Sequence, residues 1–192
     1  MRNISEILVD KIIENLIENN SIDVKDLEIY RFGIEATMLK ALHYTSYFAL
    51  AVWMNKLLEF TIIFAVFYMF RRYTGGYHVQ TRIGCYLFSC IIVFLSLLAT
   101  NLSFNWKEMM LVSCLDLITL LKLSPVQNEN RKLNAEDIAC FRQRIKITTL
   151  VFLIICIITI LMNGTYFINM YTIGLTMVSL LMLLGKAETI KI

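Results

Sequence analysis

Charged residues are scarce in this sequence, at 17% of 192 residues, and it contains a single proline. The five cysteines, at positions 85, 90, 114, 140 and 156, form no CxxC pair, so neither a disulfide framework nor a zinc site is indicated. The first 34 residues lack the apolar run of a cleavable signal peptide. No repeat, low-complexity tract or second domain is apparent. We therefore expect one domain that uses neither a metal ion nor a cofactor.

Apolar residues are abundant instead, at 58%, and they are gathered in blocks. A helix that crosses a bilayer needs about 20 apolar residues, so several of the blocks are short. The block at 60–70 is the weakest: it either extends into 56–59, joins the preceding block as one bent segment, or enters the membrane and returns. We predict an all-α, polytopic integral membrane protein with about six membrane segments, at roughly 36–54, 60–70, 83–102, 109–123, 147–162 and 166–185.

The basic residues are distributed unevenly over the polar stretches. With a cytoplasmic amino terminus and six crossings, fifteen of the eighteen Lys and Arg residues fall on cytoplasmic pieces. Only Lys56 and Lys107 fall on outer loops, and Lys40 lies inside the first segment. Because cytoplasmic loops carry such an excess, we expect both termini and the loop at 71–82 to face the cytosol. The same asymmetry explains the net charge of +3, which therefore does not imply a nucleic-acid partner.

The amino-terminal stretch has a helical pattern of its own. Ile4, Leu8, Ile12 and Leu16 recur at helical spacing, with acidic residues on the other faces. This predicts an amphipathic helix. Its acidic face differs from the Lys/Arg-rich face of helices that lie on lipid, so packing on protein is favoured over packing on the inner leaflet. Asp23 is a plausible cap for a second helical stretch.

The polar stretch at 72–78 reads RYTGGYH, and Cys85 follows seven residues after His78. On one continuous helix these two side chains would lie about 10.5 Å apart along the axis, too far for proton transfer. Gly75 and Gly76 supply the backbone freedom for a turn. A helix that begins near residue 82 would place Cys85 in its first turn, where the helix dipole favours a thiolate and free N–H groups favour an oxyanion.

These residues carry a resemblance. The pattern Arg72-x-x-Gly75-Gly76-x-His78, followed after six residues by Cys85, resembles the accessory gene regulator protein B (AgrB) family of membrane-embedded cysteine endopeptidases. The resemblance implies that Cys85 is the nucleophile and His78 its base. It also implies that Arg72, Gly75 and Gly76 support the motif or bind substrate.

The likeness extends over most of the chain. It includes the Gly33-Ile34-Glu35 entry to the first segment, and a basic loop with Pro125 and residues 130–132 before the last two segments. It implies a single AgrB-like membrane domain over 1–192, with a cytosolic helical part at 1–35, membrane segments at 36–185 and a cytosolic tail at 186–192. It further implies the cell membrane of a bacterium and an AgrD-like propeptide as substrate.

The implied reaction is removal of the propeptide's carboxyl-terminal tail and cyclisation of the remainder to a thiolactone or lactone quorum-sensing signal. A Cys85 thiolate would form a thioester and release the tail, with His78 protonating the leaving amine. A thiol or hydroxyl of the peptide would then displace Cys85, provided that water is excluded. No third residue that orients His78 is favoured by spacing among Gln80, Glu35, Glu136, Asp137 and Asp116.

Other interpretations stand beside this one. Alone, His78 reads as an interfacial histidine and Cys85 as a small apolar residue between helices. Asp116 lies deep in an apolar run, and intramembrane carboxylates are functional by default, which suits a small transporter or exporter. A scaffold without catalysis is a third class. Small residues such as Gly174 and Ser179 in the last segment suit a homodimer.

Overall fold

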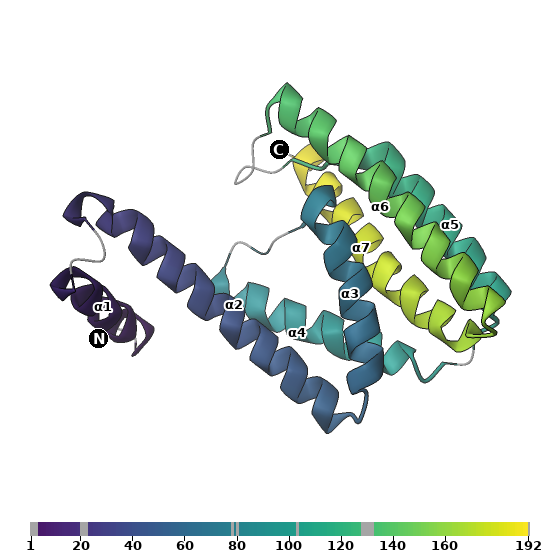
Figure 1. The fold of residues 1–192 in the computed structure, drawn as a ribbon, viewed down its shortest axis with the longest axis horizontal. Helices are drawn as coiled ribbons and strands as arrows, with labels where there is room; N and C mark the ends of the chain where they lie inside the picture. The colour runs from purple at the N-terminus through teal and green to yellow at the C-terminus, as the bar shows by residue number, and fades with distance from the viewer. Residues whose placement is uncertain are drawn as a thin grey trace. The chain divides into compact units, whose positions relative to one another are not determined.

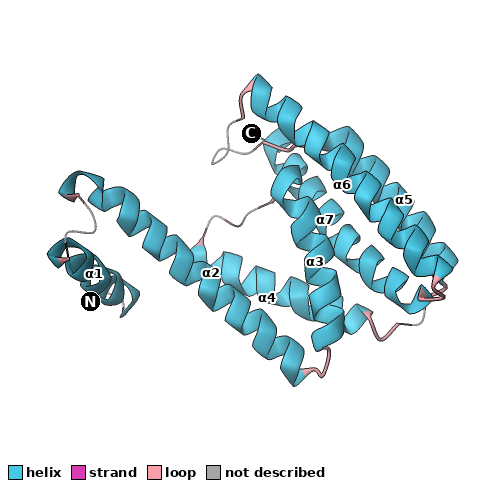
Figure 2. Cartoon of the chain, viewed as in Figure 1, coloured by secondary structure: helices cyan, strands magenta, loops and turns pink. Residues whose placement is uncertain are grey.

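The computed structural model describes residues 4–19, 23–77, 79, 81–102, 104–127 and 133–191, without the side chains of 4–7, 24 and 189–191. Over these residues the secondary structure is helical, with seven α-helices, one short 3-10 helix and no strand (Figure 2). The elements are α1 (Ile4–Glu18), η1 (Val24–Asp26), α2 (Leu27–Trp53), α3 (Leu57–Thr74), α4 (Arg82–Ala99), α5 (Trp106–Leu123), α6 (Ala135–Leu161) and α7 (Thr165–Lys191) (Figure 1). The predicted all-α fold is confirmed.

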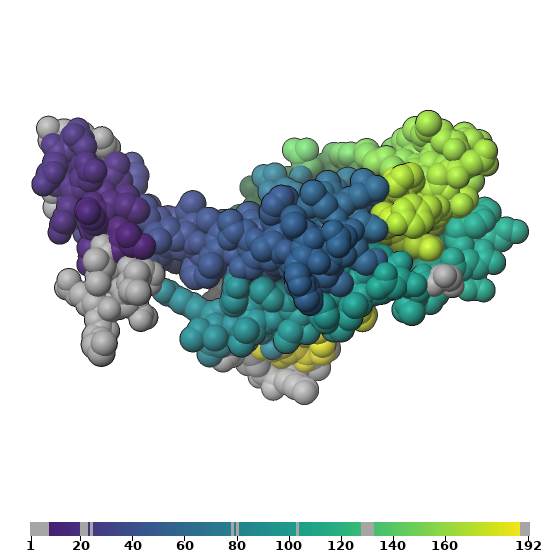
Figure 3. Space-filling model, turned by 90° about the horizontal axis from the view of Figure 1, so that it is seen from below, coloured from purple at the N-terminus to yellow at the C-terminus, as the bar shows by residue number. Residues whose placement is uncertain are grey.

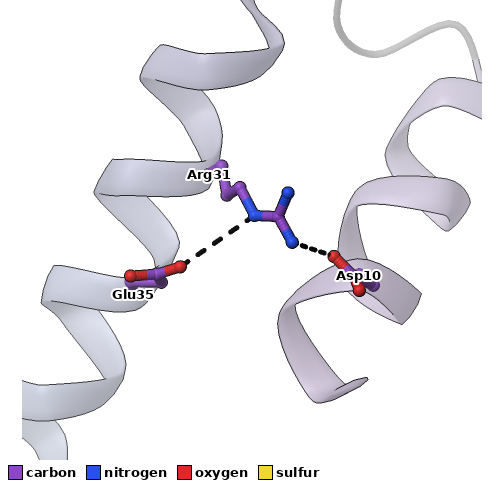
Figure 4. A network of polar contacts seen from close by, with 3 residues as sticks. All are labelled: Asp10, Arg31 and Glu35. Atoms are coloured by element: carbon purple, nitrogen blue, oxygen red, sulfur yellow. Dashed lines mark hydrogen bonds and ion pairs between the residues drawn. The ribbon is translucent and has the colours of Figure 1, made fainter. Parts of the chain in front are cut away.

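The chain divides into two compact units, residues 1–49 and 50–192. In the first unit, α1 confirms the predicted amino-terminal helix, and its Val9 and Ile13 are buried. Arg31 of α2 donates to Asp10 of α1 and lies 3.9 Å from Glu35 (Figure 4). The helix therefore packs on protein, as its acidic face predicted. The Lys25 N–H lies 3.4 Å from Asp23 Oδ1, which agrees with the expected cap.

In the second unit, α7 contacts α3, α4, α5 and α6, most extensively α3 and α5 (Figure 1). Gly174 lets α7 approach α3 closely, because a Cβ there would lie 2.7 Å from the Ile63 carbonyl oxygen. Gly174 and Ser179 are both buried within this unit, so neither offers the free surface on which a homodimer was expected. The core is made of apolar side chains from four helices, among them Val66, Phe70, Leu117, Leu120, Phe152, Leu175, Val178 and Met182.

Polar contacts join α5 to α7 inside this bundle. The Ser113 and Thr172 hydroxyls lie 2.8 Å apart, and Thr176 donates to Asp116 Oδ2 over 2.6 Å. Asp116 is therefore hydrogen-bonded to a neighbouring helix. Such interhelical hydrogen bonds hold membrane helices together where lipid supplies no hydrophobic driving force.

In the second unit, the described residues that join the helices lie at two opposite ends of the bundle. At the Lys56 end, Lys56 donates to Thr100 after α4, and the Tyr166 hydroxyl donates to Glu59 over 3.2 Å. Seen from the side of the α2–α3 turn, the atoms of α4 lie beside those of α3 (Figure 3). At the Gly75 end, the chain after α3 meets the segment after α5 and the carboxyl-terminal part of α7. Polar stretches predicted to be outer thus lie at the Lys56 end, and polar stretches predicted to be cytosolic lie at the Gly75 end.

Three of the described helical stretches are long and apolar enough to cross a membrane, by length and composition alone: Arg82–Ala99, Ala135–Leu161 and Thr165–Glu188. Helices α2 to α7 overlap the six predicted segments, although α2 and α6 begin well before theirs, and three of the helices meet the criteria for a span. Two helices of 18 residues, α3 and α5, carry charged residues at both ends. Lys40 and His43, with several hydroxyl-bearing side chains, lower the hydropathy of α2.

Candidate functional site

The site begins where α3 ends. Gly75 has φ 70° and Gly76 has φ 132°, so both glycines occupy a region that other residues rarely adopt. A Cβ at Gly75 would also lie 2.3 Å from the Val126 carbonyl oxygen. The expected turn is therefore present, and its glycines are required by backbone conformation and by close approach.

This turn is held by two distant segments of the chain. The Val126 N–H donates to the Thr74 carbonyl over 2.9 Å, and Gly75 and Val126 form a parallel β-bridge. The Tyr77 N–H donates to the Leu181 carbonyl of α7 over 2.8 Å. Gly185 makes this contact possible, because a Cβ on it would lie 2.5 Å from the Tyr77 nitrogen. The segment 74–77 is thus fixed against α7 and the residues that follow α5.

Arg71 closes the same turn from within. Its guanidinium donates to the Gly75 carbonyl and, over 2.9 Å, to the Tyr77 carbonyl. Arg72, the arginine that the motif favoured, is exposed, and its guanidinium carbon lies 5.9 Å from the Tyr73 ring centroid. From the sequence, Arg71 was expected to serve membrane topology and to favour a Cys85 thiolate by its charge, but not to hold this turn. The available signal was its place in the last turn of a helix, where arginine commonly binds the final carbonyls.

Cys85 lies in the first turns of α4, as predicted. The helix begins at Arg82, and the Thr81 side chain caps it by accepting from the Gly84 N–H over 3.2 Å. The Cys85 N–H donates to the Thr81 carbonyl over 2.9 Å, and the residue is half-buried. Both N–H groups are therefore engaged within the helix end. An oxyanion bound there would need donors other than these two N–H groups, so the expected oxyanion site stays a prediction.

His78 and Gln80 lie outside the described residues, but both chain neighbours of His78 contact α4. The Tyr77 and Phe88 rings meet edge to face, with centroids 5.6 Å apart. Phe88 is one helical turn beyond Cys85. On the other side of Cys85, a Cβ on Gly84 would lie 2.9 Å from Val79 Cγ1. The described neighbours of His78 therefore lie against α4 near Cys85.

In the comparison with protein families, the family model of accessory gene regulator B matches residues 8–183. The chain belongs to the AgrB family. The comparisons with curated proteins and with solved structures found no match. Membership in the AgrB family supports a role in processing the propeptide of the agr quorum-sensing system, and with the apolar helices it indicates a membrane protein.

The AgrB match includes the segment 71–85, and it also covers the four carboxylates that sequence reasoning considered as partners of His78. Three of them have another contact: Glu35 lies near Arg31, Asp116 accepts from Thr176, and Asp137 belongs to the capping box at the start of α6. Among the described residues, no group of three or more His, Cys, Asp or Glu side chains is arranged to hold a metal ion.

Proposed function

We propose that this AgrB-family protein is a membrane-embedded cysteine endopeptidase that cuts the tail from an AgrD-like propeptide through a thioester on Cys85. The observation that supports this most directly is the packing of Tyr77 and Val79 against α4. These residues flank His78 in the sequence, and they contact Phe88 and Gly84, which lie on either side of Cys85.

The proposed first step is acyl transfer to Cys85. His78 takes the thiol proton, and the thiolate attacks the scissile carbonyl carbon. The carbon–nitrogen bond then breaks, and His78 returns the proton to the leaving amine. The tail departs with a free amino group, while the remainder of the propeptide stays on Cys85 as a thioester.

The proposed second step closes the ring. A cysteine or serine side chain of the bound peptide loses its proton to His78 and attacks the thioester carbonyl, and the Cys85 thiolate leaves and is reprotonated. Exchange of one thioester for another is near isoenergetic. The protein therefore needs mainly to hold the internal nucleophile close and to exclude water. A site where the chain enters an apolar helix such as α4 suits both needs.

We also propose six crossings, with the Gly75 end of the bundle in the cytosol of a bacterium. Lys122 and Lys186 of α5 and α7 lie toward this end, as do Arg71 and Arg72. This excess of basic residues is the pattern of cytoplasmic loops. The opposite end contains Lys56 and Lys107.

The test uses the purified protein in liposomes with a synthetic AgrD-like propeptide, and it follows release of the tail by mass spectrometry. Cys85→Ala should abolish release, and His78→Ala should slow it by about 10²- to 10⁴-fold, the usual contribution of a general acid–base. Cys90→Ala is the matched control, because Cys90 is also a half-buried cysteine of α4. The proposal fails if Cys85→Ala still releases the tail, or if Cys90→Ala stops release as fully as Cys85→Ala does.

A further inference from the structure

We propose that Arg71 is the positioning residue for His78. Its guanidinium binds the carbonyl oxygens of Gly75 and Tyr77, the residues on either side of Gly76. Tyr77 is bonded directly to His78 in the chain. This inference rests on the proposed function, in which His78 is the base.

The guanidinium fills the inner side of the turn. Gly76 is buried, and a Cβ on it would lie 2.1 Å from Arg71 Nη1. A planar guanidinium presents several N–H donors in a rigid fork, so it can hold two carbonyls at fixed relative positions. A lysine ammonium is a compact charge on a flexible stem and lacks this fork. The shape of the turn therefore depends on arginine specifically, and only secondarily on its charge.

The other contacts of the turn fix its position relative to α7 and α4. The Tyr77 N–H is tied to Leu181 of α7, and the Tyr77 ring packs on Phe88, one turn from Cys85. With Arg71 on its carbonyl oxygen, Tyr77 is held at its amide, its side chain and its carbonyl. The peptide bond that leads to His78 thus starts from a constrained residue. Such constraint is what keeps a base in a productive geometry toward its nucleophile.

Lys122 provides a charge-matched control at the same end of the bundle. It lies in the last turn of α5, and its side chain is exposed. Arg71→Gln and Lys122→Gln therefore each remove one positive charge from this end. Only the first removes the two contacts to the turn.

The experiment measures tail release in liposomes for Arg71→Gln, Arg71→Lys and Lys122→Gln. Arg71→Gln should slow release by on the order of tenfold to a hundredfold, the cost of a misplacement of about 1 Å. Lys122→Gln should leave the rate near that of the unchanged protein. Arg71→Lys keeps the charge that membrane topology needs, so it still reports on the contacts if the glutamine variant does not accumulate. We expect it to be slow as well.

A double-variant comparison separates positioning from general damage to the fold. The comparison is repeated in a His78→Ala background, with imidazole added as a diffusing base where the rate is otherwise too low to measure. There, Arg71→Gln should cause little further loss in the rate of tail release, because the side chain that Arg71 positions is gone. Equal slowing by Arg71→Gln with and without His78 would overturn the inference, and so would equal slowing by Arg71→Gln and Lys122→Gln. Continued cleavage by Cys85→Ala would instead refute the proposed function itself.

Discussion

Thr81 sets the start of α4, and with it the turn of that helix on which Cys85 lies. Its side chain accepts from the Gly84 N–H, and its carbonyl accepts from the Cys85 N–H. Replacing an N-cap hydroxyl by an apolar group costs typically about 1 kcal/mol of stability. The cap therefore contributes to the order of the turn that carries the proposed nucleophile.

We predict that Thr81→Val lowers the stability of the first turn of α4 by about 1 kcal/mol, while Thr81→Ser retains the cap. The measurement is hydrogen exchange of residues 82–85 in detergent micelles, where the valine variant should exchange faster. Equal exchange in the valine and serine variants would show that the cap does not hold this turn.

At the same scale, the features that depend on neighbouring residues in the sequence were predicted correctly. The pair Gly75 and Gly76 indicated a turn, and the polar stretch before the apolar run indicated a helix start near Cys85. It did not find Gly185, whose role depends on the approach of Tyr77 from more than one hundred residues earlier in the chain. No local pattern encodes such a contact.

At the scale of elements, the packing of α7 on α3 depends on Gly174. A Cβ at this position would lie 2.7 Å from the Ile63 carbonyl oxygen and 3.1 Å from Val66 Cβ. A helix backbone cannot yield as the end of a flexible side chain does. An added methyl must therefore push the two helices apart.

We predict that Gly174→Ala lowers the free energy of unfolding in detergent by about 1–3 kcal/mol, the usual cost of overpacking. Gly33→Ala is the control, because a Cβ there has nothing within 4 Å and glycine is a weak helix former. Its midpoint of thermal unfolding should be unchanged or higher. A Gly174→Ala midpoint as high as that of Gly33→Ala would contradict the close crossing.

The positions of the helices were predictable from the apolar blocks, but their ends were less so. Helix α6 begins at Ala135, twelve residues before the predicted segment at 147–162, so Arg142 and Lys146 lie on a helix. The signal was available: Asn134 and Asp137 form a capping box. Hydropathy identifies only the apolar part of a helix. It does not identify a polar extension of the same helix, such as the first part of α6.

At the scale of the whole molecule, the question is which end of the bundle faces the cytosol. Helix α5 offers a matched pair of sites, because Lys107 lies near its start and Lys122 near its end, and both side chains are exposed. In the proposed topology, Lys107 faces outward and Lys122 faces the cytosol.

We predict that a membrane-impermeant maleimide labels Lys107→Cys on intact cells and labels Lys122→Cys only after the membrane is opened, both in a background whose native cysteines are alanine. The reason is the excess of basic residues at the Gly75 end. Labelling of Lys122→Cys on intact cells, with Lys107→Cys protected, would invert the topology and place the site outside the cytosol.

At this scale, the sequence predicted the fold class but not the number of membrane crossings. The block pattern predicted an all-α membrane protein, and three helices in the described part of the chain meet the length and composition of spans. For α3 and α5, charged ends make composition ambiguous, so the number of crossings could not be fixed this way. The reaction was suggested by the likeness of one motif to a family, and membership in that family followed from the match over 8–183.

The most direct test of the account is to trap the acyl-enzyme. The protein in liposomes is mixed briefly with an AgrD-like propeptide and stopped in acid, and its mass is measured before and after peptide digestion. We predict an adduct of the tail-less propeptide on the peptide that contains Cys85, cleaved by neutral hydroxylamine as a thioester would be. Tail release without any adduct on Cys85, or an adduct on another cysteine, would contradict the account.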